Sequence, residues 1–232
     1  DVDTTYGDDG VVRVTATQVD STDPRIRLTP LPSGRALLSW SEWRTADTDT
    51  NVVIARLNSA GTVDAGFANS GRFRRRIAEG TGVFVGATGS GKPLIAWAAS
   101  DPDAGEYVAP TVRVQRLTAA GAPDATFGNA GTVTLDAATA TDGDLRGLAA
   151  SGERVLLLTR TYLSERGAAW RMVRLATGGA VDSAKVVSTG RDVEYVDYLV
   201  LTDTDRAVTL VNRSVDADNR TPERVVLRRL AG

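Results

Sequence analysis

The amino-acid sequence predicts an all-β fold, and three observations lead to that class. Apolar runs of strand length recur at regular spacing along the 232 residues. Turn-forming stretches rich in Gly, Ser, Asp and Pro separate these runs. No stretch shows the 3.6-residue period of an amphipathic helix. Short, evenly spaced strands with turn signals between them are typical of all-β domains.

One sequence unit recurs along the chain and divides it into repeats of about 60 residues. Each unit begins with an arginine and a leucine, and an aspartate stands eight positions after the arginine. These pairs are Arg56 and Asp64, Arg116 and Asp124, and Arg174 and Asp182. Gly71 and Gly131 close the first two units. The chain opens with the tail of the same unit, residues 2–10, and ends with its head, residues 229–232.

Each repeat contains a second shared feature, a tight turn followed by an apolar strand. The turns are Pro32–Arg35, Gly89–Lys92, Ala150–Glu153 and Asp203–Arg206. Trp40 and Trp97 fall at the same position of the strand that follows, so we expect both rings to fill the core between repeats. The first repeat then divides into four short strands, which are Arg25–Leu31, Ala36–Trp43, Val52–Leu57 and Gly71–Ile77.

A four-stranded unit repeated along the chain is typical of a propeller blade, so the sequence predicts a single domain, a four-bladed β-propeller. The predicted blade units are 18–77, 78–136, 137–190, and 191–232 completed by 1–17. Both termini fall inside the same unit, which predicts that the ring closes by strand sharing. Val11–Thr17 would then be the outer strand of the last blade, and closure would remove the exposed sheet edges.

The stretches Leu57–Gly71 and Leu117–Gly131 resemble the delta-60 repeat family of bacterial β-propeller-like proteins. The motif of that family runs approximately Arg-Leu-x-x-x-Gly-x-x-Asp-x-x-Phe-Gly-x-x-Gly, and the resemblance extends over essentially the whole chain. One copy departs from it, because Lys185 stands where the aromatic residue is expected. The family is a fold family without a shared activity. The resemblance therefore implies architecture and export from a bacterial cell, and it implies no chemistry.

Composition limits the possible function classes. The net charge is -2 with mixed signs, which gives no electrostatic footprint for nucleic acid. No apolar run approaches the ~20 residues of a membrane span, so we expect no membrane insertion. The chain lacks cysteine and histidine, which excludes thiol nucleophiles and removes the usual general base. Abundant Ala, Val, Thr, Asp and Gly, with two lysines only, are typical of a high-GC bacterium such as an actinomycete. The start at Asp1 without a signal peptide indicates a mature fragment or an excised domain.

One glycine-rich segment imitates a phosphate-binding loop. Residues 86–92 match the first seven positions of a P-loop, but Pro93 replaces the hydroxyl residue that would hold magnesium. A P-loop must also open a helix, whereas Pro93 leads into a strand-like run. We therefore expect a tight turn of the repeat here and no nucleotide site.

Acidic residues cluster in segments that connect predicted strands. Asp47, Asp49 and Asn51 resemble the start of a calcium loop, but the sixth-position glycine and the twelfth-position glutamate are missing. Asp101 and Asp103, like Asp216 and Asp218, fall in the corresponding segments of other repeats. We expect solvated acidic loops without a cofactor, with bound calcium as the weaker alternative. Nothing selects a pair of carboxylates facing across a cleft, as a glycosidase requires.

The repeats offer an internal comparison that separates scaffold from function. Turns that are alike in all repeats serve the scaffold, whereas connections that differ are free to bind a ligand. The candidate ligand-binding residues on this variable face are Trp43, Asp47, Asp49, Asp101, Asp103, Tyr107, Tyr162, Arg166, Asp216 and Arg220. Aromatic rings among charged groups suit sugars and polar protein surfaces.

We therefore expect a non-catalytic recognition module of a secreted or surface bacterial protein. Its partner would be a cell-surface glycan, bound in a lectin-like way, or another protein, including other parts of a larger secreted protein. Two alternatives remain open, a structural spacer in a larger assembly and a carboxylate-dependent hydrolase.

Overall fold

The computed structural model describes residues 1–16, 19, 25–43, 50–77, 82–99, 111–136, 139, 144–163, 167–190, 193–201, 207–214 and 224–230. Its strands form antiparallel sheets that follow one another along the chain, and the prediction of an all-β fold is confirmed. One short 3-10 helix, η1 (Pro32–Gly34), interrupts the strands of the first repeat. No helix in the described part of the chain is long and apolar enough to span a membrane.

Three sheets have four strands each, and a further sheet has three. The first contains β1 (Arg27–Pro30), β2 (Ala36–Trp43), β3 (Thr50–Leu57) and β4 (Arg72–Ile77). The second contains β5 (Val83–Ala87), β6 (Pro93–Ala99), β7 (Thr111–Arg116) and β8 (Thr132–Leu135). The third contains β9 (Asp144–Ser151), β10 (Arg154–Leu163), β11 (Gly167–Leu175) and β12 (Val181–Gly190). The fourth contains β13 (Val193–Leu201), β14 (Ala207–Ser214) and β15 (Arg224–Leu230).

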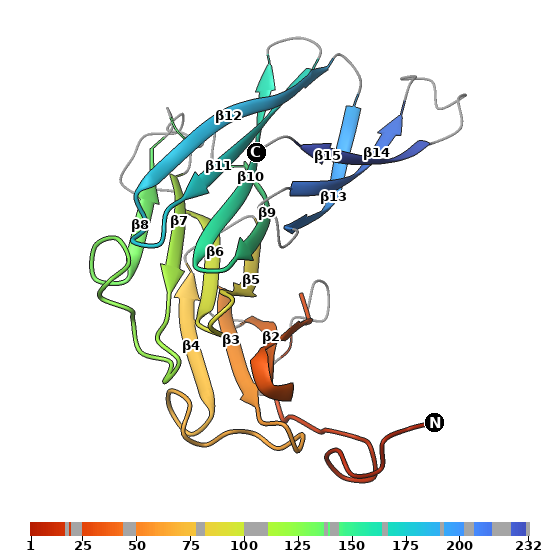
Figure 1. Cartoon of the computed structure of the whole chain (residues 1–232), viewed down its shortest axis with the longest axis vertical. Helices are drawn as coiled ribbons and strands as arrows, with labels where there is room; N and C mark the ends of the chain where they lie inside the picture. Colours follow the sequence, from red (N-terminus) through yellow and green to blue (C-terminus); the bar gives the residue numbers. More distant parts are fainter. Residues whose placement is uncertain are drawn as a thin grey trace.

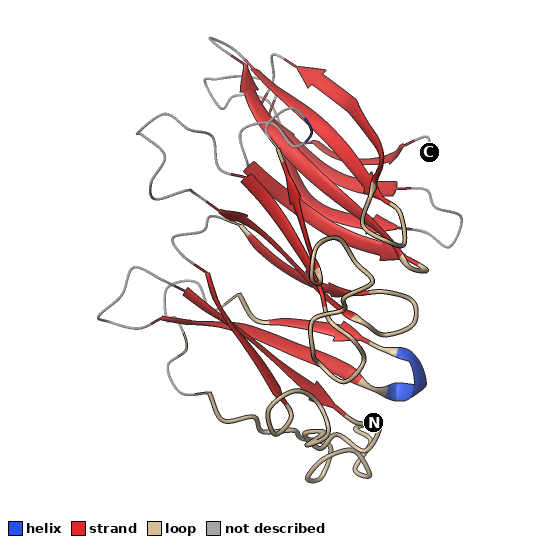
Figure 2. Ribbon diagram, turned by 90° about the vertical axis from the view of Figure 1, so that its left-hand side faces the viewer, coloured by secondary structure: helices blue, strands red, loops and turns tan. Residues whose placement is uncertain are grey.

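Each sheet is a meander in which strands that are consecutive in the chain pair side by side. The sheets succeed one another along the molecule, from the sheet of β1–β4 at the bottom of the view to those of β9–β15 at the top (Figure 1). The loops 58–71 and 117–131 and the helix η1 gather on one side of the stack (Figure 2). We call this side the latch end, and the side toward which β2 and β6 run we call the variable end.

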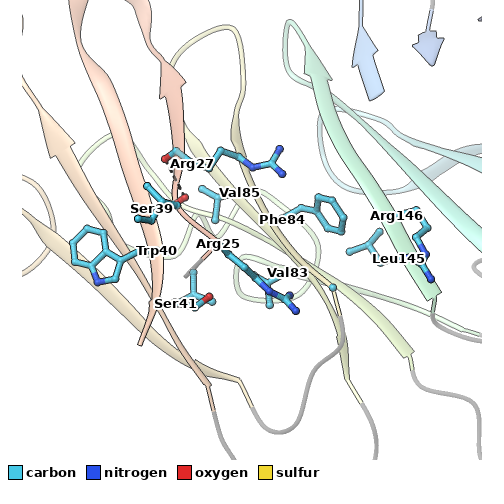
Figure 3. Close-up of a pocket in the computed structure, with 13 residues that line it drawn as sticks. Arg25, Arg27, Ser39, Trp40, Ser41, Val83, Phe84, Val85, Leu145 and Arg146 are labelled. Carbon is cyan, nitrogen blue, oxygen red and sulfur yellow. Dashed lines mark hydrogen bonds between the residues drawn. The ribbon is translucent and has the colours of Figure 1, made fainter. Parts of the chain in front are cut away.

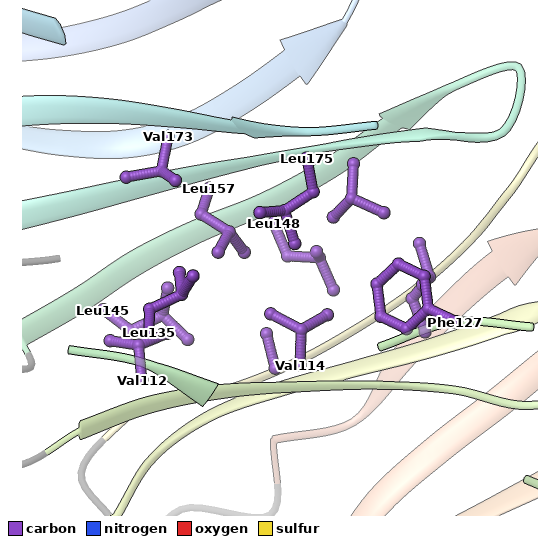
Figure 4. Close-up of a cluster of buried hydrophobic side chains, with 12 residues drawn as sticks. Val112, Val114, Phe127, Leu135, Leu145, Leu148, Leu157, Val173 and Leu175 are labelled. Carbon is purple, nitrogen blue, oxygen red and sulfur yellow. The ribbon is translucent and has the colours of Figure 1, made fainter. Parts of the chain in front are cut away.

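The core lies between successive sheets. One cluster joins the first sheet, through Ile54 and Phe67, to the second sheet, through Ile95 and Trp97. A second cluster joins the second sheet to the third, with Phe127 at the position equivalent to Phe67 (Figure 4). Strand β6 is buried at every residue, because the first sheet covers one of its faces and the third sheet covers the other. Trp40 and Trp97 are both buried, at 4% and 3% exposure, as the repeat position predicts.

The third repeat departs from the first two after its arginine. In the first two repeats a long loop separates the third strand from the fourth. In the third repeat β12 begins at Val181, Asp182 stands at a register shift of its ladder with β11, and Lys185 pairs with Met172 in that ladder. The long loop needs a buried aromatic anchor and a closing glycine, and this repeat has neither. A continuous hairpin forms in its place.

The N-terminal segment packs beside the first sheet. Val14 and Ala16 contact the cluster formed by Trp40, Val53 and Ala55, so this apolar face of the sheet is partly covered. The described residues 11–16 form no strand, and the sheet of β13, β14 and β15 has three strands. The prediction that Val11–Thr17 is the outer strand of the last blade is therefore not confirmed, because no described strand pairs with the free edge of β15.

Candidate functional site

The recurring arginine and aspartate form an ion pair that also connects neighbouring sheets. The Nε atom of Arg56 lies 2.9 Å from Oδ2 of Asp64, and its guanidinium donates to the carbonyl oxygen of Ala119 in the next repeat. Arg116 repeats both contacts, at 2.8 Å to Asp124 Oδ2 and 2.6 Å to the Thr177 carbonyl oxygen. The contacts are structural, since the same pair recurs at the same place in successive repeats.

A phenylalanine and a backbone amide complete this connection. The Arg56 and Arg116 guanidinium carbons lie 4.8 and 4.6 Å from the ring centroids of Phe67 and Phe127. Beside the rings, the Ala68 amide donates to the Ala120 carbonyl oxygen at 2.7 Å, and the Gly128 amide donates to the Gly178 carbonyl oxygen at 2.8 Å. The arginine, aspartate, aromatic ring and amide together are called the latch below.

Residues 2–10 fold as a latch without their own arginine. The Gly7 amide donates to the Ala60 carbonyl oxygen at 2.8 Å, as Ala68 and Gly128 do to the repeats that follow them. The Asp3 carboxylate accepts from the amide and the hydroxyl of Thr5, as the Asp124 carboxylate does from Thr126. The segment thus seats the aromatic residue Tyr6 on the first repeat, where an added Cβ on Gly61 would lie 3.0 Å from its ring.

The second latch is the most buried, and its carboxylate is strongly stabilised. Burial alone would raise the pKa of Asp124, but hydrogen bonds from Thr126 and Lys92, together with the Arg116 guanidinium, hold that pKa well below its usual range. Lys92 Nζ lies 3.0 Å from Asp124 Oδ2. The P-loop-like segment 86–92 therefore forms the end of β5 and the turn into β6, and its lysine binds the Asp124 carboxylate of the latch.

The structure describes few of the residues that the sequence proposes for ligand binding. Trp43 ends β2, and Tyr162 lies in β10 opposite Ala168. The remaining candidates lie outside the described residues, and they are Asp47, Asp49, Asp101, Asp103, Tyr107, Arg166, Asp216 and Arg220. Asn51, the third weak calcium candidate, pairs within the first sheet with β2 and with β4, so it belongs to the scaffold. Among the residues that the structure describes, no group of acidic side chains is placed to hold a metal ion.

A cavity of about 420 Å³ lies at the variable end, where the first three sheets meet. It is lined by the start of the innermost strand of each sheet and by the neighbouring part of β2. Among the described residues, the lining includes Arg25, Arg27 and Arg146 and no carboxylate (Figure 3). Ser39 and Ser41 contribute hydroxyl groups from β2, and Phe84 contributes a half-buried ring from β5. A concave site that combines apolar walls with a few convergent polar groups is the usual form of a ligand pocket.

Among the described residues, the Asp144 carboxylate lies just outside this lining. It accepts hydrogen bonds from Arg146, with Nη2 2.9 Å from Oδ2, and from Arg160, with Nε 2.7 Å from Oδ2. Two guanidinium groups thus share a single carboxylate. Arg27 makes a cation–π contact with Phe84 at 5.6 Å, and its guanidinium donates no hydrogen bond to any described residue.

Sequence reasoning missed these arginines. It sought aromatic and acidic residues within the connecting segments, whereas Arg25, Arg27 and Arg146 stand where those segments end and the innermost strands begin. The signal that could have found them is the presence of arginine at this place in two of the repeats, where the second repeat has Gly82 and Phe84.

Comparison with known proteins relates the chain to β-propellers. Residues 43–67 match the family described as "Domain of unknown function (DUF5122) beta-propeller". No curated protein matches. The endo-arabinase from Bacteroides thetaiotaomicron VPI-5482 is similar in structure, with 12% sequence identity, a TM-score of 0.46, and coverage of 87% of this chain and 72% of that chain.

A second solved structure with a similar arrangement is the acylaminoacyl peptidase of Pyrococcus horikoshii. It has 10% sequence identity and a TM-score of 0.43, and the match covers 87% of this chain and 30% of that chain. The family match and the succession of four-stranded antiparallel sheets agree in architecture, and the chain is a β-propeller-like domain.

Proposed function

We propose that this domain is a non-catalytic recognition module of a secreted or surface-attached bacterial protein, which binds a glycan in a lectin-like way or a protein partner at the variable end. The difference between the two ends of the sheets carries the proposal. At the latch end, ion pairs and backbone bonds between repeats occupy the polar groups. At the variable end, three sheets enclose a cavity, and connections of differing sequence leave the strands.

The experiment that tests the proposal is binding of the purified domain to whole bacterial cells and to a glycan array. Tyr107→Ala and Tyr162→Ala alter the variable end, and Lys185→Ala on the exposed surface of β12 is the matched control. We expect a loop variant to weaken binding by more than about 1 kcal/mol, because a few anchors usually dominate an interface. If the parent binds neither cells nor any glycan or protein offered, the module is a structural spacer.

We also propose that the sheets are four blades of a ring and that residues 2–16 complete the fourth blade, because four repeats fill the chain and both termini fall inside the same repeat unit. The latch formed by Asp3, Tyr6 and Gly7 supports this. Each of the other latches belongs to one repeat and contacts the repeat that follows it, and this latch contacts the first repeat, so it takes the place of a latch of the fourth repeat. The arginine missing from that latch would be Arg229, which stands at the equivalent position of the fourth repeat.

An uncovered apolar face on the first sheet also supports ring closure. Ile26 and Leu28 are each 64% exposed. Their equivalents in the second repeat, Val83 and Val85, pack in the core against the first sheet. A ring would cover this face with the fourth blade and remove an exposed hydrophobic surface.

Ring closure predicts a definite register. In the first blade Val53 of β3 lies opposite Arg74 of β4. The equivalent pair across the closure is Val226 and Arg13. The chain contains no cysteine, so the double variant Arg13→Cys and Val226→Cys tests this pair without interference. Directly opposite residues have Cα atoms about 5 Å apart, within reach of a disulfide.

We expect this double variant to form an intramolecular disulfide under mild oxidation, detected by mobility and mass. The control joins Arg13→Cys with Lys185→Cys, which lies on the outer strand of the third sheet. Deletion of residues 1–16 should in addition expose Trp40 and cause aggregation. Equal cross-linking in the two double variants, or a deletion variant that melts like the parent, would show that the ring does not close in this way.

A further inference from the structure

The arginines of the variable-end cavity point to the charge of the ligand. We propose that this cavity binds an anionic group, a carboxylate or a phosphate, carried by an acidic glycan. The inference rests on the proposed function and specifies the ligand class for it.

The first argument is the positive charge of the side chains that line the cavity. Thirteen of the described residues line the cavity, and these thirteen include three arginines and no carboxylate, although the whole chain carries a net charge of -2. Two of the arginines come from the first sheet and one from the third, so residues distant in the sequence bring positive charge to one concave surface. Walls of low dielectric strengthen such a field inside a cavity.

The second argument is the availability of donors. Arg27 presents its guanidinium beside the Phe84 ring, 5.6 Å from the ring centroid, and donates no hydrogen bond to a described residue. Arg146 is held in place by Asp144, which it shares with Arg160. A planar guanidinium fork matches the geometry of a carboxylate or phosphate group and binds it through two parallel hydrogen bonds.

The third argument is the remainder of the lining. Phe84 lies between the arginines of the first sheet and Arg146 (Figure 3), and it offers an apolar surface on which the face of a sugar ring can pack. Ser39 and Ser41 provide hydroxyl groups on β2. Together these groups suit a sugar ring that bears an acid, whereas a purely apolar ligand would offer no acceptor to the Arg27 guanidinium.

The test measures binding of the whole chain to three probes by calorimetry. These probes are an oligogalacturonate, an oligomer of galactose phosphate, and a neutral oligosaccharide of galactose with the same length as the oligogalacturonate. We expect one of the two anionic probes to bind, with an affinity that falls as ionic strength rises. The preferred anionic probe identifies whether the acid is a carboxylate or a phosphate.

Substitutions then locate the site. Arg27→Gln should weaken binding of the anionic probe by about tenfold or more, because hydrogen bonds to charged groups contribute strongly. Arg27→Lys, which keeps the charge and loses the fork, should restore part of the affinity. The matched control is Arg35→Gln. Arg35 lies beside η1 at the latch end and donates to the Pro32 carbonyl oxygen, so this variant should bind the anionic probe with the affinity of the parent. Circular dichroism verifies that all three variants are folded.

The outcomes separate this inference from the proposed function. If cells, a protein or the neutral oligosaccharide bind while neither anionic probe does, the acidic-glycan inference is wrong and the recognition module stands. If an anionic probe binds equally to the parent and to Arg27→Gln, the cavity is not its site. If no probe and no cell binds, both proposals are overturned.

Discussion

Arg116 and Asp124 form an ion pair that is almost completely enclosed by protein, with their side chains 1% and 6% exposed and Nε 2.8 Å from Oδ2. The same guanidinium reaches the Thr177 carbonyl oxygen in the next repeat. A pair of residues eight positions apart in one repeat thus fixes the position of its neighbour. The equivalent pair of the third repeat, Arg174 and Asp182, is 30% and 40% exposed.

This difference in burial predicts different costs of breaking the two pairs. Arg116→Met should lower the free energy of unfolding by about 3 kcal/mol, because the buried Asp124 carboxylate loses its guanidinium partner and the Thr177 carbonyl oxygen loses its donor. Arg174→Met should cost about 1 kcal/mol or less, since water replaces the lost partner of an exposed pair. Urea denaturation of the two variants measures both values. Equal decreases in the free energy of unfolding of the two variants would show that burial does not increase the contribution of the Arg116–Asp124 pair to stability.

Stability should fall in acid through Asp124. Its pKa is depressed below the ordinary value of 3.8 in the folded protein, so the carboxylate stabilises the fold above that pH. The stabilisation is lost as pH falls below 3.8 toward the folded pKa, with a slope of up to about 1.4 kcal/mol per pH unit. Asp124→Asn should remove this part of the pH dependence. Denaturation of parent and variant across the acid range measures it, and parallel curves would argue against the assignment.

A glycine at the turn of each of the first three repeats, Gly61, Gly121 and Gly179, allows the close approach of the preceding latch. Gly121 has a φ of +86°, and an added Cβ would lie 2.8 Å from the Ala68 amide nitrogen. Gly152 also has a positive φ, of +54°, but an added Cβ there meets nothing within 4 Å. Gly152→Ala should therefore cost only the left-handed strain, about 1 kcal/mol, whereas Gly121→Ala should cost clearly more. Thermal melts compare the two, and equal costs would mean that the latch moves aside freely.

Two groups of aromatic residues should respond differently to truncation. Trp97 is buried between the first two sheets, with the Arg75 guanidinium carbon 4.6 Å from its ring centroid. Trp97→Ala should cost about 3–5 kcal/mol of stability. Tyr107→Ala and Tyr162→Ala should each change stability by about 0.5 kcal/mol or less if the variable end is a binding surface. If both tyrosine variants are unfolded in a melting experiment, these rings belong to the core and the binding surface does not lie at the variable end.

The sequence allowed the strands of the first repeat to be predicted closely, because each begins or ends at a turn residue with a local cause. The strand predicted over Ala36–Trp43 has these bounds in the structure, and the one predicted over Val52–Leu57 begins two residues earlier, at Thr50. The structural role of the Arg–Asp pairs could also be predicted, since recurrence in several repeats indicates a scaffold.

The cavity could not be predicted from the sequence, because it depends on where separate sheets meet. Arg27 and Arg146 are far apart in the chain, and no local pattern indicates that their side chains line one concave surface. The packing of Val14 and Ala16 on Trp40 is likewise a tertiary contact without a local signal. Lys185 did mark the third repeat as different, but the hairpin that replaces the loop follows from the absence of an aromatic anchor and became clear only in the structure.

The hairpin at Lys185 makes the junction between the third and fourth repeats weaker than the two junctions before it. Stacked repeats unfold as units coupled to their nearest neighbours, so the weakest junction determines where the chain first opens. Buried latches hold the first sheet to the second and the second to the third, whereas the third repeat offers the fourth an exposed ion pair and no anchoring ring. Thermal opening should therefore begin between β12 and β13. A mechanical force applied to the two ends of this domain would first separate β13 from β12, and the first three sheets would stay folded.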